Sequence, residues 1–253
     1  MSNLMDHPLL VFVLTFFLLS FSAWIGKSLA EGKRILEGTV RQDFGVILAA
    51  TLTLLGLIAG FTFSMALNRY DQRKNYEEQE ANAIGTEYLR AGVLPAADAA
   101  KVQTLLLNYL DQRVLFYSTV DDEQLRKIDA QTAKLQAELW SAVRTPVERD
   151  PVTALAVSGM NDVLNSQGYT LAAWRNRIPI AGWALMVVIA ICSNMLVGFG
   201  AANDKPKFIL LLVLPLIVSI TFLFIADIDS PRAGFIRVIP QNILSLSQSL
   251  HAQ

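Results

Sequence analysis

The chain has little of the material from which most catalytic and metal sites are built. Among its 253 residues it contains one cysteine, Cys192, and two histidines, His7 and His251, which lie at opposite ends. A single cysteine excludes a disulfide framework and a thiolate metal cluster. Glycine-rich phosphate loops, the His-Glu-x-x-His motif and nucleophile elbows are also missing from the sequence. We therefore expect no enzyme, no metal site and no cofactor.

An excess of charge of either sign is missing as well. The 21 basic and 22 acidic residues leave a formal net charge of −1, so the chain has no general electrostatic attraction to nucleic acid. Hydrophobic residues, in contrast, make up 53% of the chain, which is more than an ordinary soluble domain contains. The composition predicts an integral membrane protein whose surroundings are the lipid bilayer, with no nucleic-acid partner.

Four apolar runs are long enough to cross a bilayer core, which takes about 20 residues. They lie at residues 8–24, 44–67, 178–199 and 208–226. Residues 1–7 contain no Lys or Arg, so we interpret the first run as a retained membrane helix and not as a cleaved secretory signal. The pattern predicts a multi-pass membrane protein with four transmembrane helices.

The segment between the second and third runs is too long for a loop and has helical periodicity throughout. Within it, Asp150 and Pro151 form an expected N-cap and first-turn pair. We predict an all-α fold in which a helical extramembrane domain is inserted between transmembrane helices two and three. The predicted division is 1–67 for helices one and two, 68–177 for the helical domain with its stalk, 178–228 for helices three and four, and 229–253 for a tail with a short amphipathic helix.

No stop signal follows the second apolar run. Opposite charges four residues apart, at Arg73 with Glu77 and at Lys74 with Glu78, support continued helix in solvent. The first stop signals are Gly92 and Pro95. The second transmembrane helix is therefore predicted to leave the membrane without a break and to run from Asp43 to Gly92.

One face of this long helix carries only small or neutral polar residues. Its members follow one another at steps of three or four: Thr53, Gly56, Gly60, Ser64, Asn68, Gln72, Asn75, Gln79, Asn82 and Thr86. The Gly56-x-x-x-Gly60-x-x-x-Ser64 part permits close approach of membrane helices. Two interpretations are open, a packing seam against neighbouring helices or a wet surface that faces an axis surrounded by several copies, as in a pore.

Aromatic and acidic residues beside this face would contribute to such a pore. Phe61 or Phe63 could form a hydrophobic constriction in an oligomer, and as lipid- or core-facing aromatics they would need no further explanation. Four acidic residues either form rings of charge around an axis or are solvated or paired: Glu77, Glu78, Glu80 and Glu87. The expected pore-lining or constriction residues are Gly56, Gly60, Phe61, Phe63, Ser64, Asn68, Gln72, Asn75, Gln79 and Asn82.

Two carboxylates, Asp227 and Asp229, lie where the fourth apolar run ends. They form a candidate cation or salt-bridge site, although two carboxylates fall short of the roughly six to eight oxygens that calcium prefers. The other interpretation is a salt bridge or cap with an arginine at the same membrane face, such as Arg69, Arg73 or Arg232. Inside the third run, Asn194 is expected to bond between helices.

The membrane orientation stays open at this point. Basic residues in the short connectors place the helical domain outside the cell, whereas the basic residues that flank the membrane on the domain side reverse the count.

Several segments resemble the bacterial bestrophin-like membrane family. They read GFTFSMA at 60–66, RYDQR at 69–73, EANAIGTEYLR at 80–90, LP at 94–95 and YLDQR at 109–113, and the signature Asp227-x-Asp229-x-Pro231-x-x-Gly234 completes them. The family is distantly similar to bestrophins, which are pentameric anion channels with four membrane helices, a helical cytosolic body and a pore lined by the second helix.

The resemblance implies a homo-oligomer, with a pentamer favoured, in the bacterial inner membrane. It implies an ion channel that conducts small ions, with anions preferred, and it places the helical domain in the cytosol. The long acidic cluster by which animal bestrophins hold calcium is reduced here to Asp227 and Asp229, so calcium gating is not expected. The alternative function is a membrane-anchored helical sensor or interaction scaffold without ion conduction.

Overall fold

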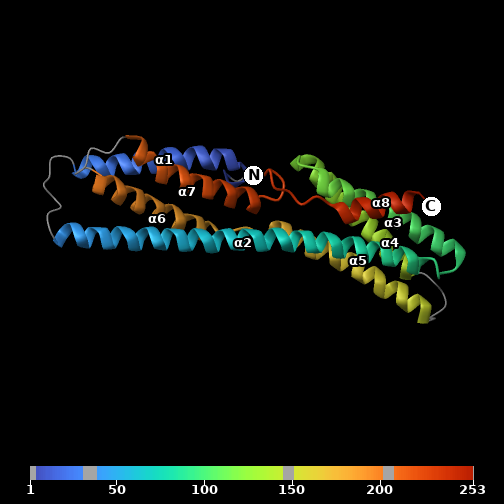
Figure 1. Ribbon diagram of the computed structural model, residues 1–253. Coiled ribbons are helices and arrows are strands. Elements are labelled where there is room, and N and C mark those ends of the chain that lie inside the picture. Colours follow the sequence, from blue (N-terminus) through green and yellow to red (C-terminus); the bar gives the residue numbers. More distant parts are fainter. Residues whose placement is uncertain (1–3, 31–38, 145–150, 202–207, 253) are drawn as a thin grey trace. The chain divides into compact units, whose positions relative to one another are not determined.

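The computed structural model describes residues 4–30, 39–144, 151–201 and 208–252. Within these ranges every regular element is a helix, which confirms the predicted all-α class (Figure 1). After a short 3₁₀ turn, η1 (Leu4–Asp6), the helices follow in this order: α1 (Pro8–Ala30), α2 (Thr39–Ala91), α3 (Ala96–Ser118), α4 (Asp122–Arg144), α5 (Pro151–Arg175), α6 (Ile180–Gly200), α7 (Phe208–Asp229) and α8 (Gln241–His251).

Two compact units make up the chain. The membrane unit comprises Met1–Asn68 and Arg177–Arg237, and the helical unit comprises Arg69–Asn176 and Val238–Gln253. Figure 1 shows α2 as one unbroken helix, and its residues contribute to both units. The helix begins four residues before the expected start and ends at Ala91, directly before Gly92.

Four stretches of the membrane unit are long and apolar enough to cross a bilayer, as predicted. In this unit α1 packs on both α6 and α7. The contact of α1 with α6 requires two glycines, because a Cβ added to Gly26 would lie 1.9 Å from the carbonyl oxygen of Met195, and one added to Gly198 would lie 1.9 Å from that of Ala23. Close backbone approach through small residues is how membrane helices associate without a hydrophobic driving force.

Asn194 was expected to bond between helices, and this prediction was wrong. Its side-chain amide donates a hydrogen bond of 2.8 Å to the carbonyl oxygen of Ala190, one turn earlier in α6 itself. A short polar side chain reaches the carbonyl four residues back more easily than a neighbouring helix. The bond between helices comes from Ser22 instead, whose hydroxyl donates to the carbonyl oxygen of Ile191 at 2.7 Å.

The helical unit is built around one core to which α2, α3, α4, α5 and α8 all contribute. Each helix places a fully buried apolar side chain in it: Ile84, Leu106, Leu139, Met160 and Ile243, in that order of helices. The amphipathic tail helix α8 therefore belongs to this core. Asp121 precedes α4 and accepts a hydrogen bond of 2.9 Å from the backbone N–H of Gln124, which caps the helix. The expected cap Asp150 lies outside the described residues.

Candidate functional site

The ten small or neutral polar residues that share one face of α2, from Thr53 to Thr86, form the α2 stripe. All ten residues are exposed in the single chain. The membrane part of α2 is also the least covered of the apolar helices. In the most apolar 18-residue window of α2 only 6% of the residues are buried, against 33% in that of α1 and 39% in that of α7. The described part of the chain therefore leaves the membrane part of this helix largely uncovered.

The two glycines of the stripe, Gly56 and Gly60, are also uncovered. A Cβ added to Gly56 or Gly60 would meet no other atom within 4 Å. These small residues consequently do not serve close packing against another described helix of the same chain. Whatever meets this face, whether another copy of the chain, lipid or water, comes from outside the described chain.

The residues beside the glycines differ in their exposure. Phe61 is 64% exposed, and Phe63 is half-buried. Between them Thr62 is buried, and its hydroxyl donates to the carbonyl oxygen of Ile58 at 2.8 Å. Phe61 is thus the more available of the two aromatics for a contact outside the chain.

Four charged residues of α2 lie on the other face, inside the helical unit. Arg73, Glu77, Glu80 and Glu87 are all buried, with exposures of 1% or less, whereas Glu78 is exposed. This burial excludes rings of charge around an axis for Glu77, Glu80 and Glu87. The interpretation as paired groups is confirmed for Glu77 and Glu80, whose partners are described next.

Glu80 is the centre of a buried polar cluster that joins three helices. Its carboxylate pairs with the guanidinium of Arg113 from α3 and accepts hydrogen bonds from the hydroxyls of Tyr117, at 2.9 Å, and of Thr170 from α5, at 3.0 Å. The guanidinium carbon of Arg113 lies 4.2 Å from the ring centre of Phe116, a cation–π contact. Burial, and then the charge of Glu80, raise the pKa of Tyr117, so its hydroxyl stays protonated as a donor.

Glu77 fixes the tail helix to α2. One carboxylate oxygen accepts a hydrogen bond of 2.9 Å from the backbone N–H of Ile243, and the other accepts one of 2.8 Å from the side-chain amide of Asn242. Both donors lie in the first turn of α8, where backbone N–H groups have no partner within the helix. Leu246 of α8 then packs over Gly85, where an added Cβ would lie 3.0 Å from its side chain.

The sequence contains a signal for this buried face that our interpretation of the stalk missed. Glu80, Ile84, Glu87 and Ala91 recur at helical spacing, and all four are buried. Carboxylates in register with apolar core positions indicate buried, paired groups as readily as solvated ones.

Asp227 and Asp229 bind backbone amides of the membrane unit. Asp227 accepts hydrogen bonds from the N–H groups of Phe235 and Ile236, at 2.6 and 2.9 Å, and both oxygens of Asp229 lie 3.2 Å from the N–H of Ile178. A Cβ added to Gly234 would lie 2.5 Å from the carbonyl oxygen of Asp227, so only glycine fits this turn. Within the described ranges, no group of three or more His, Cys, Asp or Glu residues could hold a metal ion.

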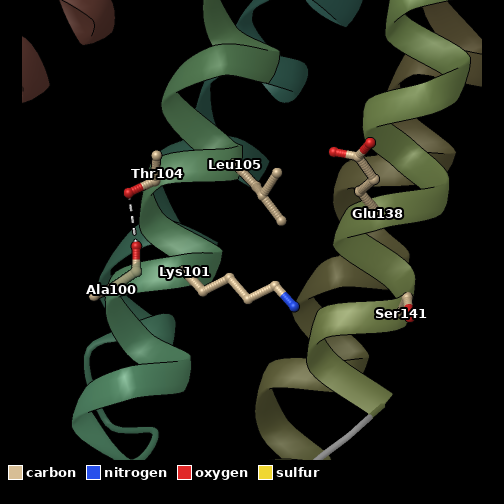
Figure 2. A pocket seen from close by; sticks show the side chains of 6 residues that line it. All are labelled: Ala100, Lys101, Thr104, Leu105, Glu138 and Ser141. Atoms are coloured by element: carbon tan, nitrogen blue, oxygen red, sulfur yellow. Dashed lines mark hydrogen bonds between the residues drawn. The ribbon is translucent and has the colours of Figure 1, made fainter.

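A surface hollow lies apart from the stripe, between α3 and α4 (Figure 2). It has a volume of about 600 Å³ and is lined by Ala100, Lys101, Thr104, Leu105, Glu138 and Ser141. The hydroxyl of Thr104 donates to the carbonyl oxygen of Ala100 at 2.8 Å, so it is engaged within its own helix. The charged side chains of the wall, Lys101 and Glu138, are both exposed.

The family's sequence profile, described as a bestrophin-like domain, matches residues 13–243. The chain belongs to the bestrophin-like family. The resemblance found in the sequence is thereby confirmed, and with the four apolar helices it makes the protein a multi-pass membrane protein of the cell membrane.

Solved structures with the same fold include a bacterial bestrophin homolog from Klebsiella pneumoniae. At 15% sequence identity and a TM-score of 0.65, the match covers 96% of this chain and 97% of that one. A variant of a bacterial bestrophin homolog from the same organism matches with 13% identity and a TM-score of 0.64, over 95% and 98% of the two chains. At these identities the likeness shows the fold of this bestrophin-like protein. No curated protein matches the chain in sequence.

Proposed function

We propose that this bestrophin-like protein is a homo-oligomeric ion channel, that the α2 stripe lines its axis, and that it conducts anions. Membership of the bestrophin-like family supports a function as an ion channel. The observation that carries the shared axis is the uncovered α2 stripe. Its ten small or amide residues are exposed, and only 6% of the most apolar segment of α2 is buried.

The composition of the stripe suits water better than lipid. In the membrane part its members are glycines and hydroxyl residues, and beyond Ser64 they are amides. The amides lie beyond the apolar run, where they meet water, and a row of glycines and hydroxyl residues offers little apolar surface to lipid. Several copies of α2 around a common axis would place these groups against water or against one another, while the other faces of α2 would meet lipid or the neighbouring copies.

The stripe and the two phenylalanines beside it have separate roles in this proposal. Gly56, Gly60 and Ser64 permit the copies of α2 to approach closely. Phe61 or Phe63 narrows the path and gates it by excluding water. Asn68, Gln72, Asn75, Gln79 and Asn82 line the wider part. Their N–H₂ groups can donate to an anion, although their carbonyl oxygens can also accept a hydrated cation. The anion preference and the pentamer rest on the family resemblance.

Current through the purified protein in planar bilayers under a salt gradient tests this proposal. We expect a reversal potential on the chloride side and a conductance that rises several-fold in Phe61→Ala or Phe63→Ala. Phe21→Ala is the matched control, since Phe21 lies on α1, is 57% exposed and should leave the conductance unchanged.

Two outcomes would overturn parts of the proposal. A reversal potential on the cation side would refute the anion preference and keep the pore. Absence of current from protein that is folded and oligomeric would refute the channel and favour a sensor or scaffold.

A further inference from the structure

Glu87 differs from the other buried charged groups of α2. Its exposure is 0%, yet neither carboxylate oxygen has a hydrogen-bond partner in the described part of the chain. Arg73, Glu77 and Glu80 on the same face all bond to backbone or side-chain groups. A buried ionised carboxylate without such partners is strongly disfavoured, whereas a neutral carboxyl tolerates the same place far better.

The carboxyl group of Glu87 packs against α5 at a glycine. A Cβ added to Gly159 would lie 1.9 Å from Oε2 of Glu87 and 2.5 Å from Nη1 of Arg90. The absence of a side chain at Gly159 is therefore what leaves room for the carboxyl group between α2 and α5. A side chain at position 159 would displace the ends of Glu87 and Arg90.

Two charged groups act on Glu87, one from each of the two helices. Arg90 lies one turn later on α2, and Asp162 lies on α5. Nη1 of Arg90 is 3.9 Å from Oδ2 of Asp162, so the guanidinium is shared with a second acid. Burial raises the pKa of Glu87 to about 8, Arg90 opposes this change and Asp162 adds to it.

We propose that Glu87 is a proton-binding site that couples the packing of α5 on α2 to pH. In its protonated form the carboxyl group stays buried over Gly159. When it ionises, the charge is drawn toward water and Arg90, and the contact between the two helices weakens. This inference does not depend on ion conduction, because it concerns the helical unit alone.

The sign of the pH dependence follows from linkage. In the unfolded chain Glu87 has its ordinary pKa of 4.5. Between that value and about 8 the folded protein holds one proton more than the unfolded chain, so its stability falls as the pH rises through this range and levels off above it. Below the pKa of the unfolded chain Glu87 is protonated in both the folded and the unfolded protein, so it no longer makes the stability depend on pH.

Two measurements on the purified full-length protein in detergent test the proposal. Infrared difference spectra against pH follow the carbonyl band of a protonated carboxyl group, and thermal unfolding midpoints are recorded from about pH 6 to about pH 9. We expect a band that disappears with a midpoint near pH 8 in the wild type and is absent in Glu87→Gln. The unfolding midpoint should fall with pH more steeply in the wild type than in Glu87→Gln.

Two further variants make the result decisive. Asp162→Asn removes the charge that adds to the shift, so the titration midpoint should move to lower pH. Glu78→Gln, at an exposed position nine residues earlier on α2, should behave as the wild type. Identical titration and identical pH dependence in the wild type and Glu87→Gln would refute the proposal. If Glu87→Gln fails to fold, an unmoved midpoint in Asp162→Asn would refute it instead.

Discussion

Two pairs of glycines in the membrane unit have opposite surroundings. At Gly26 and Gly198 the backbone of the neighbouring helix occupies the space beside the glycine, and a backbone oxygen lies 1.9 Å from the position of an added Cβ. Gly56 and Gly60 meet nothing within 4 Å. Small residues permit another helix to approach closely, but only the structure tells whether that helix belongs to the same chain. No described helix of the same chain packs on Gly56 and Gly60, which is why we propose that other copies of the chain meet this face of α2.

The same contrast continues along α2 outside the apolar segment, between adjacent residues. Glu80 is fully buried and bonded to α3 and α5, while Gln79 is exposed. Glu80 faces inward and has bonding partners there, whereas the neutral amide of Gln79 faces outward and needs none. Polarity alone would suggest the reverse.

The largest loss of stability is expected when the buried residue of this pair, Glu80, is replaced. Glu80→Ala leaves Arg113 buried without its carboxylate, which should cost about 3–5 kcal/mol of the free energy of unfolding. Gln79→Ala, on the exposed side, should change it by less than about 0.5 kcal/mol. Thermal or denaturant unfolding of the two variants measures the difference. Similar stabilities would show that the Glu80 cluster does not hold α2 to α3.

A smaller effect should separate the two glycine pairs. Gly26→Ala drives a Cβ into the backbone of α6, which cannot shift without moving the helix, and should destabilise the protein by about 3 kcal/mol. Gly56→Ala is the matched control, and because its Cβ meets no atom it should leave the fold intact or stabilise the helix by up to about 1 kcal/mol. Unfolding in detergent at low protein concentration compares them. A loss of stability in Gly56→Ala as large as in Gly26→Ala would contradict the contrast.

Much of the fold could be predicted from the sequence because it depends on length and periodicity. Four apolar runs are long enough for four spans, and the absence of any stop signal before Gly92 predicts one continuous α2. The shared face of the stripe follows from spacing alone. These properties are local, so the residues themselves carry them.

The parts that could not be predicted depend on partners that are distant in the sequence. The burial of Glu80 requires Arg113 and Thr170, which lie 33 and 90 residues away. Asp227 binds backbone N–H groups, which carry no residue signature, so this arrangement at the turn of Gly234 could not be predicted from the sequence. The pore role of the stripe depends on other copies of the chain and remains a proposal.

The most direct test of that central claim is block of the current by a water-soluble thiol reagent at a single engineered cysteine. In a Cys192→Ser background, Asn75→Cys places the thiol on the stripe, and Lys74→Cys places it at the adjacent exposed position off the stripe. We predict that the reagent lowers the current several-fold in Asn75→Cys and leaves Lys74→Cys unaffected. Equal block at both positions, or block at Lys74→Cys alone, would contradict an axis lined by the α2 stripe.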